Sequence, residues 1–371
     1  MIIAAGIRGF KRFEEAHFEF APLTVLTGMN GSGKTSLLQA ILLAKEAGAI
    51  GPDALSLNGP FDLELGTAED VLNWESSSPI SIRLDGSDIE TAEWLLAVPT
   101  EDALYLDVQS RPSLCPKAMS GTPRAFTYLS AERLGPRGYT SASPLPDSHI
   151  EVGARGQFCA HVLAVLGDRP IKDSKRWHPL YTGTAPRLLK YEVEQWLSEM
   201  TRPIEVVGAR LAGSAVAELR FRAPGSEWVK STNMGFGLTY SLPIVLAGLI
   251  AETGGLVLVE NPEAHLHPAG QSRMGVFLAW LAARGVQVVI ETHSDHVING
   301  IRRAVAEHGY LEPSMAVLHW FGSDDERGER SHATLAIGET GSVSDWPKGF
   351  FDQYQIDVAS LGRIRRGRRD G

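Results

Sequence analysis

Eight residues near the start of the chain decide the fold: G-M-N-G-S-G-K-T, Gly28 to Thr35. They follow a short apolar stretch, Leu23 to Thr27, and they precede leucine and isoleucine residues at helical spacing. A G-x-x-x-x-G-K-[ST] pattern between a strand and a helix is typical of a phosphate-binding loop, because its glycines let backbone N–H groups converge on phosphate oxygens. The positive end of the helix adds to this attraction. The pattern therefore predicts a nucleotide site.

The side chains of the loop have separate expected roles. Lys34 should reach the β- and γ-phosphates of ATP, and the Thr35 hydroxyl should bind Mg²⁺. ATP and Mg²⁺ are thus the cofactors that we predict. The residues expected to hold the nucleotide are Gly28, Asn30, Gly31, Ser32, Gly33, Lys34, Thr35 and Ser36.

A site of this kind needs a second strand that carries an acid toward the magnesium. The apolar run Leu256 to Val259 ends in Glu260, which is the candidate metal residue beside Thr35. Asn261 comes next and cannot act as a base for an attacking water, which leaves Glu263 as the candidate base. An acid at 263 is also typical of a helix start, where the helix dipole favours negative charge. Both interpretations of Glu263 stay open.

The rest of the chain indicates an α/β fold. After residue 233, expected helices at 238–252, 271–284 and 295–307 alternate with expected strands at 256–260 and 286–291. Such alternation implies a mostly parallel sheet, to which we add an antiparallel β portion. We expect one domain over residues 1–371, with an acidic β-rich excursion at 48–120 and a basic, partly helical excursion at 140–205. An Arg-rich tail at 360–371 is expected to be disordered.

Charge is segregated along the chain, whose net charge is -9. From Asp53 to Asp107 there are 13 acidic residues and one basic residue, whereas Gly153 to Lys190 holds seven basic residues and two acidic ones. Five arginines lie between Arg363 and Arg369. One interpretation is solvated loops and a mobile tail. The other is a basic surface for phosphate backbones beside an acidic surface that repels them.

Composition excludes several classes of protein. The best apolar run, Leu242 to Ile250, is far shorter than the roughly 20 residues that span a bilayer, and the first residues lack the basic start of a signal peptide. We therefore expect a cytoplasmic protein without a membrane partner. Cys115 and Cys159 have neither CxxC nor metal-ligand spacing, so no disulfide framework or zinc site is indicated.

Several motifs carry a family resemblance. They are I-R-G-F-K-R-F at 7–13, the loop with its flanks at 23–41, V-E-N-P-E-A-H-L-H-P at 259–268, I-E-T-H-S-D-H-V-I-N-G-I at 290–301 and D-W-P-K-G-F-F-D-Q at 345–353. With them the chain resembles the ABC-type ATPase heads of the SMC and OLD (overcoming lysogenization defect) groups. The last motif is similar to the end of a bacterial branch that has no Toprim nuclease domain.

The resemblance implies roles for particular residues. Glu260 matches the family's usual Asp, Asn261 falls where the catalytic glutamate usually lies, and His293 matches the histidine that contacts the γ-phosphate. The stretch T-N-M-G-F-G-L at 232–238 lies where the signature motif is expected, with Asn233, Gly235 and Gly237 as nucleotide-binding residues. Because this motif completes the site of a second subunit in the family, the resemblance implies an ATP-dependent homodimer. Asn261 makes ATP binding a firmer expectation than rapid hydrolysis.

Two other features of the sequence suggest functions that differ from an ATPase. Two histidine groups, Glu263-His265-His267 and His293-Asp295-His296, suggest a catalytic metal but match no strong zinc spacing. Fewer than 80 residues follow His293, and we interpret Asp324-Asp325-Glu326 as an acidic loop rather than a nuclease centre.

Two functional hypotheses follow. The first is an ATPase that acts on duplex DNA in repair or anti-phage defence, with a separate nuclease or effector protein. The alternative is a slow, nucleotide-gated scaffold that holds a protein partner on its acidic 53–107 face. A transporter motor is disfavoured by the absence of an LSGGQ sequence and by the long excursions between Lys34 and Glu260.

Overall fold

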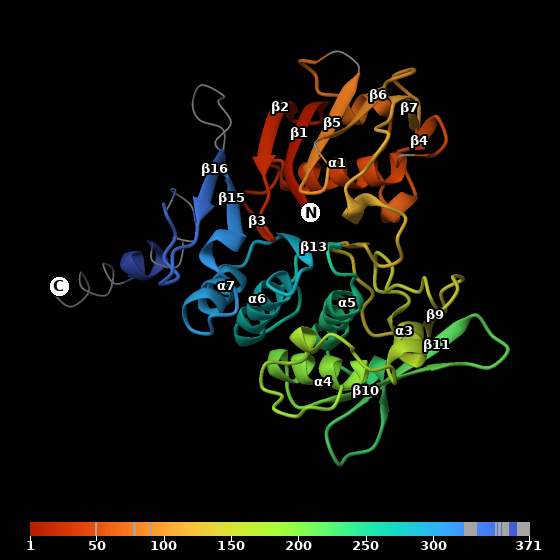
Figure 1. Cartoon of the computed structure of the whole chain (residues 1–371), viewed down its shortest axis with the longest axis vertical. Coiled ribbons are helices and arrows are strands. Elements are labelled where there is room, and N and C mark those ends of the chain that lie inside the picture. Colours follow the sequence, from red (N-terminus) through yellow and green to blue (C-terminus); the bar gives the residue numbers. More distant parts are fainter. Residues whose placement is uncertain are drawn as a thin grey trace.

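The computed structural model describes residues 1–48, 50–76, 79–89, 91–322, 332–345, 347, 350 and 356–361. Two six-stranded sheets and a smaller four-stranded sheet form the body of the protein (Figure 1). The acidic triplet at 324–326 and the arginines of the tail at 363–369 lie outside the described residues. None of the described helices combines the length and apolar character that crossing a bilayer requires.

A mostly parallel sheet forms the core, and it confirms the expected α/β fold. Its strands are, in spatial order, β16 (His332–Ala336), β15 (Ala316–Phe321), β3 (Leu23–Gly28), β14 (Gln287–Glu291), β13 (Leu256–Glu260) and β8 (Phe126–Leu129). All neighbouring pairs are parallel except β15 with β16. Alternate residues of these apolar strands point to opposite faces, so both faces need a cover.

Helices cover the two faces of the core sheet. On β13, Leu256 and Leu258 pack in the same cluster as α1 (Lys34–Ala47), whereas Val257 and Val259 pack with helices on the opposite face. Those helices are α5 (Phe236–Ile250), α6 (Pro268–Ala282) and α7 (Asp295–Ala306). The boundaries have local causes, because Ser294 caps the N-terminus of α7 and Pro268 begins α6.

An antiparallel sheet lies on the far side of α1. Its strands are, in spatial order, β2 (Phe13–Glu19), β1 (Ile2–Phe10), β5 (Ile80–Gly86), β6 (Ala92–Ala97), β7 (Tyr105–Ser110) and β4 (Ala54–Ser56), and α2 (Ala68–Val71) lies in the same segment. The strands after residue 48 therefore extend the sheet begun by β1 and β2. The side chains of α1 pack in one hydrophobic cluster with both sheets.

The remaining elements form a third part below the core in Figure 1. They are β9 (Thr140–Ser141), α3 (Cys159–Leu166), α4 (Leu189–Met200), β10 (Glu205–Arg210), β11 (Val216–Arg222) and β12 (Val229–Lys230). Five 3-10 turns complete the described structure: Pro60–Asp62, Lys117–Met119, Ser174–Arg176, Ser231–Asn233 and Pro313–Met315. The segment at 140–205, which was expected to be partly helical, contains α3 and α4.

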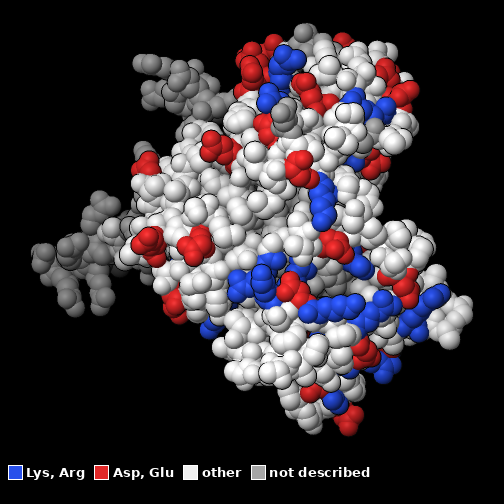
Figure 2. Space-filling view, viewed as in Figure 1, with Lys and Arg blue, Asp and Glu red and all other residues white. Residues whose placement is uncertain are grey.

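Ion pairs neutralise much of the basic segment from Gly153 to Lys190. The pairs are Arg155 with Asp62 and Glu132, Arg169 with Asp147, Arg187 with Glu192, and Lys190 with Asp168. Arg176 is buried against the Ala251 carbonyl. Several of these acids lie outside the segment, so its charge in the sequence overstates the positive charge at the surface. Figure 2 still shows Lys and Arg gathered in a band across the lower part of the molecule, with acids prominent on the antiparallel part.

Two histidines join the core sheet to the antiparallel sheet. The buried His319 on β15 has Nε2 2.8 Å from the Glu19 carbonyl, and its Nδ1 lies 3.1 Å from Nε2 of His332. A carbonyl only accepts, so Nε2 of His319 carries the proton and its Nδ1 accepts from His332. Burial lowers the pKa of both rings, that of His332 to about 4.

An aromatic cluster attaches the third part to the core. Trp196 on α4 is 1% exposed, and its ring centroid lies 5.0 Å from Phe277 and 4.9 Å from Trp280 on α6. We expect Trp196→Ala to lower the free energy of unfolding by about 3–5 kcal/mol, because it removes a buried ring and leaves a cavity. Urea denaturation measures the change. The control is Trp228→Ala, at a residue 36% exposed, and a Trp196 variant as stable as that control would contradict the prediction.

Candidate functional site

The loop at Gly28–Thr35 begins against β15. A Cβ on Gly28 would lie 2.0 Å from the Phe321 carbonyl oxygen, so only glycine fits there. Gly28 also has a φ of 132°, a backbone conformation that glycine adopts without strain. The next residue, Met29, donates its N–H to the same carbonyl at 2.9 Å. These contacts turn the chain out of the sheet and start the loop.

The start of α1 is prepared for an anion. Gly33 precedes the helix with a φ of 108°, no side chain caps the helix, and its first turn holds no acid. The first N–H groups of a helix have no partner within the helix, and they attract phosphate oxygens. Thr67 caps α2 and Ser294 caps α7, whereas α3, α4 and α5 also begin without a side-chain cap; what distinguishes α1 is the glycine-rich loop that precedes it. The uncapped start of α1 therefore fits a phosphate group.

Lys34 and Arg12 provide positive charge at this loop. Lys34 is 3% exposed, and its Nζ donates to the carbonyls of Gly28 at 3.1 Å and Met29 at 2.6 Å. Burial lowers the pKa of Lys34, and the nearby Glu291 carboxylate opposes this effect. Arg12, from the turn between β1 and β2, donates to the Gly31 carbonyl at 2.5 Å. Both cations are placed where they can meet a polyphosphate.

The Thr35 hydroxyl faces a carboxylate that the sequence analysis did not single out. Its Oγ1 lies 3.0 Å and 2.9 Å from the two carboxylate oxygens of Glu291, the last residue of β14. The parallel register pairs Glu291 with Glu260, the last residue of β13. Thr35, Glu260 and Glu291 therefore lie at the same edge of the core sheet.

Several negative charges lie close to Glu291. The pKa of Glu291 is raised to about 7, mainly by burial; the like charges of Glu260 and Glu263 add to this rise, and the hydrogen bond from Thr35 and the Lys34 ammonium oppose it. Burial also raises the pKa of Glu260. A divalent cation would relieve this crowding, and hydroxyl and carboxylate oxygens are the ligands that Mg²⁺ prefers. The residues present thus fit the expected metal.

Glu260 is held by the neighbouring strand. Its Oε1 accepts from the Tyr128 hydroxyl at 2.8 Å, and its Oε2 accepts from the Ala131 N–H at 3.2 Å. The buried Arg133 donates to the carbonyls of Glu260 and Asn261, both at 2.7 Å. Burial lowers the pKa of Arg133 to about 10. Arg133 therefore fixes the main chain just after β13.

Asn261 adopts a left-handed turn with a φ of 45°. Its N–H donates to the Glu291 carbonyl at 2.8 Å, and its Oδ1 is buried without a hydrogen-bond partner among the described residues. Asn tolerates this backbone conformation better than most residues. The side chain thus forms part of the turn that leaves the metal strand, at the position where the resemblance places a catalytic acid.

Glu263 holds the segment that carries His293. Its Oε2 accepts from the Thr292 hydroxyl at 2.7 Å, and its Oε1 accepts from the His293 N–H at 2.9 Å. The His293 ring lies 3.9 Å from the Glu291 carboxylate. Burial and the Lys34 ammonium lower the pKa of His293, while an interaction with the Gly28 backbone opposes them. Glu263 therefore fixes the backbone at His293, and the His293 ring lies beside the loop.

The expected signature segment lies apart from this group. Asn233 ends a 3-10 turn, and Gly235 precedes α5 with open space around its Cα. A Cβ on Gly237 would meet the His265 carbonyl oxygen at 2.7 Å, and Phe236 between them is 51% exposed. Within the described part of the chain, no hydrogen bond or ring contact joins residues 233–237 to the loop at 28–35.

The histidines at 265, 267 and 296, which the sequence suggested as metal ligands, make other contacts. The His265 ring packs against Tyr240, with centroids 4.5 Å apart, and His267 caps α6. His296 lies 3.7 Å from Asp295, its neighbour in the chain. In the residues that the structure describes, no group of three or more His, Cys, Asp or Glu side chains could hold a metal ion.

Glu291, Arg12 and Arg133 are the site residues that sequence reasoning missed. Glu291 had a detectable signal, because it ends an apolar strand whose carboxyl end must lie beside the loop in a parallel sheet. Arg12 lies in a short turn far from the loop in sequence. No local pattern distinguishes the buried Arg133 from a surface arginine.

Comparisons with known families match three segments of the chain. Residues 6–56 match a family described as "AAA domain", and residues 190–298 match one described as "AAA ATPase domain". Residues 311–361 match a family described only as a protein of unknown function. The first two segments contain the loop and the Glu260 to His293 region.

One curated relative and two solved structures extend this similarity. An "OLD nuclease" from Thermus scotoductus is 24% identical over 336 residues, which cover 78% of this chain and 58% of the relative. A structure of an Smc head bound to the C-winged helix domain of ScpA has a TM-score of 0.56 at 12% identity, over 91% of this chain and 98% of that one. A Pyrococcus furiosus Smc head with an extended coiled coil, bound to the C-terminal domain of ScpA, has a TM-score of 0.51 at 11% identity, over 98% of this chain and 99% of that one. The chain thus has the Smc head fold and spans just over half of the curated relative.

Proposed function

From the premise that this chain is an SMC/OLD-like P-loop ATPase, we propose that it binds and hydrolyses ATP with Mg²⁺ and dimerises when ATP is bound. We further propose that it acts on duplex DNA in repair or anti-phage defence, together with a separate nuclease or effector protein. The name of the curated relative supports a nuclease context.

The observation that carries this proposal is the convergence of groups around one sheet edge. The uncapped start of α1 and the Lys34 ammonium suit the phosphates, and Thr35 with Glu291 and Glu260 suits the metal. When bound, the metal would supply charge neutralisation for the phosphate oxygens. His293 stands beside Lys34 and Gly28, where it can contact the terminal phosphate.

Slow turnover is the alternative that Asn261 supports. Asn261 has an amide in place of a carboxylate. Both carboxylate oxygens of Glu263 already accept hydrogen bonds from residues 292 and 293. A general base needs to reach the proton that it removes. A slow ATPase that gates a protein partner on the acidic face at 53–107 therefore remains the second candidate function.

Phosphate release distinguishes the two functions. We expect Lys34→Ala to lower release about tenfold or more, with or without DNA, because Lys34 stabilises the phosphate charge. Glu263→Gln should also lower it, whereas the surface control Lys230→Ala should not. If the wild type releases phosphate no faster than Lys34→Ala, even with DNA present, the ATPase proposal is rejected and the scaffold function is retained.

Light scattering tests the dimer. We expect Glu263→Gln to change from monomer to dimer mass on addition of ATP and Mg²⁺, since residues 233–237 need a second loop to contact. Adding Phe236→Asp should prevent this change, because a charge would enter the interface. Tyr105→Asp, at another exposed aromatic residue, is the control. A monomer mass that ATP leaves unchanged would reject the dimer.

DNA association is tested by its dependence on salt. Lys172 and Lys175 have no acid partner among the described side chains, so they are the cations of their segment best able to meet phosphates. We expect binding to weaken as salt is raised, and the double change to Ala to reduce the slope of log K against log salt by about two. Arg8→Ala on β1 is the control. Binding that salt does not alter, or no binding, would count against DNA as the partner.

A further inference from the structure

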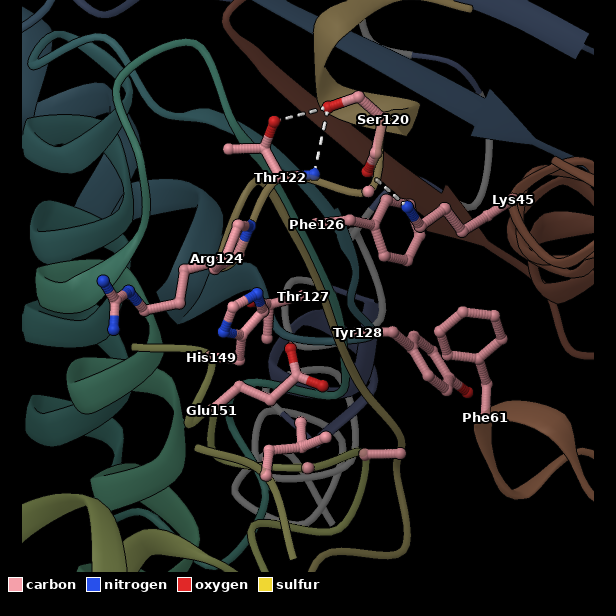
Figure 3. Close-up of a pocket in the computed structure, with 15 residues that line it drawn as sticks. Lys45, Phe61, Ser120, Thr122, Arg124, Phe126, Thr127, Tyr128, His149 and Glu151 are labelled. Atoms are coloured by element: carbon pink, nitrogen blue, oxygen red, sulfur yellow. Dashed lines mark hydrogen bonds between the residues drawn. The ribbon is translucent and has the colours of Figure 1, made fainter. Parts of the chain in front are cut away.

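A cavity of about 310 Å³ lies between α1, the edge strand β8 and the loops at 120–125 and 145–154 (Figure 3). Its volume is within the range of roughly 300–1,000 Å³ that small-molecule sites occupy. None of the residues from Gly28 to Thr35 lines it. The cavity is therefore separate from the ATP site.

Three aromatic rings form one wall of the cavity. Phe126 and Tyr128 are two residues apart on β8 and so share one face of the strand. Phe61 comes from the antiparallel part, with its ring centroid 5.6 Å from Phe126 and 6.3 Å from Tyr128. The Phe61 and Tyr128 rings are nearly perpendicular, at 88°. A planar ligand could stack on one of these rings and make an edge-to-face contact with the other.

An unpaired carboxylate faces this wall. Glu151 makes no hydrogen bond and no ion pair with any residue that the structure describes, and in Figure 3 its carboxylate points into the space between His149 and Tyr128. Burial raises the pKa of Glu151, and the Lys45 charge opposes this effect. A half-buried carboxylate without a partner is costly, and N–H donors of a ligand would compensate it.

Two cations border the same cavity. Lys45, in the last turn of α1, donates to the carbonyls of Met119 at 3.1 Å and Ser120 at 2.7 Å. The Arg124 guanidinium lies 4.0 Å from its nearest acid, Glu252, at the limit of an ion pair. Lys45 retains a donor that could bind an anionic group, whereas the Arg124 guanidinium points away from Lys45 and Glu151 in Figure 3. The lining thus suits a ligand with N–H donors and a negative charge.

Backbone conformation marks the same two segments. Phe61 and Arg124 have φ values of 54° and 58°, which residues other than glycine rarely adopt. Each costs free energy that the surrounding structure must offset, and such residues cluster at ligand sites. Here the two strained residues line one cavity although they come from two distant parts of the chain.

We propose that this cavity binds a nucleoside monophosphate. The base stacks against Phe61 and Tyr128 and donates its N–H groups to Glu151, while Lys45 binds the phosphate. The Tyr128 hydroxyl donates to Glu260 at 2.8 Å, so the ligand contacts a residue that holds the candidate metal acid. An effect on ATP turnover through Tyr128 rests on the proposed ATPase function, whereas the binding does not.

Isothermal titration calorimetry of the full chain carrying Lys34→Ala tests the binding without the ATP site. The probes are AMP, GMP, CMP and UMP, and we expect at least one to bind once per chain. In that background Glu151→Gln should weaken binding about tenfold, because a charged acceptor is lost. Phe61→Ala should weaken it similarly through lost stacking.

Glu46→Gln is the matched control, because Glu46 lies beside Lys45 on α1 but outside the cavity lining. The variant that carries both Lys34→Ala and Glu46→Gln should bind the nucleoside monophosphate with the same affinity as Lys34→Ala alone. Absence of binding by all four probes would overturn the proposal, and so would equal affinities in the Glu151 and Glu46 variants. Neither result bears on phosphate release by the wild type, so the two proposals can fail separately.

Discussion

The parallel hydrogen-bonded register of β3, β14 and β13 is the constraint on which the site depends. It pairs Leu26 with Glu291 and Glu291 with Glu260, so the start of the loop and two carboxylates end at one edge of the sheet. A shift of one residue would send each of these side chains to the opposite face. The alternating apolar residues of the three strands pack into different clusters on the two faces, and this packing excludes the shifted register.

This arrangement costs folding free energy. Glu260 and Glu263 lie close enough to Glu291 to raise its pKa, and burial removes much of the water that would screen these charges. The compensation comes from Thr35, Tyr128, the backbone N–H groups of 131 and 293, and the buried Arg133. Such sites are less stable than an apolar packing would be, and the cost is typical of functional sites.

Local periodicity and turn chemistry predicted the core strands β3, β13 and β14 and the helices around them from the sequence, whereas β15 and β16 were not predicted. The order of the strands does not follow from local pattern, and for that reason Glu291 was missed although its strand was expected. The charge pattern of the sequence overstates the positive charge of the surface for a related reason. Arg155 pairs with Asp62, which is far away in sequence, so only the fold reveals that the basic segment is partly neutralised. Helix α3 is short and apolar on most sides, which leaves no amphipathic signal.

Helix α1 gives the molecule a mechanical connection. Its first residue is Lys34 of the loop, and Lys45 of the cavity lies in its last turn, so 14 residues form a rod about 21 Å long. A continuous helix transmits a displacement along its axis from one end to the other. A shift at the phosphate end would therefore change the position of Lys45 relative to the carbonyls of Met119 and Ser120.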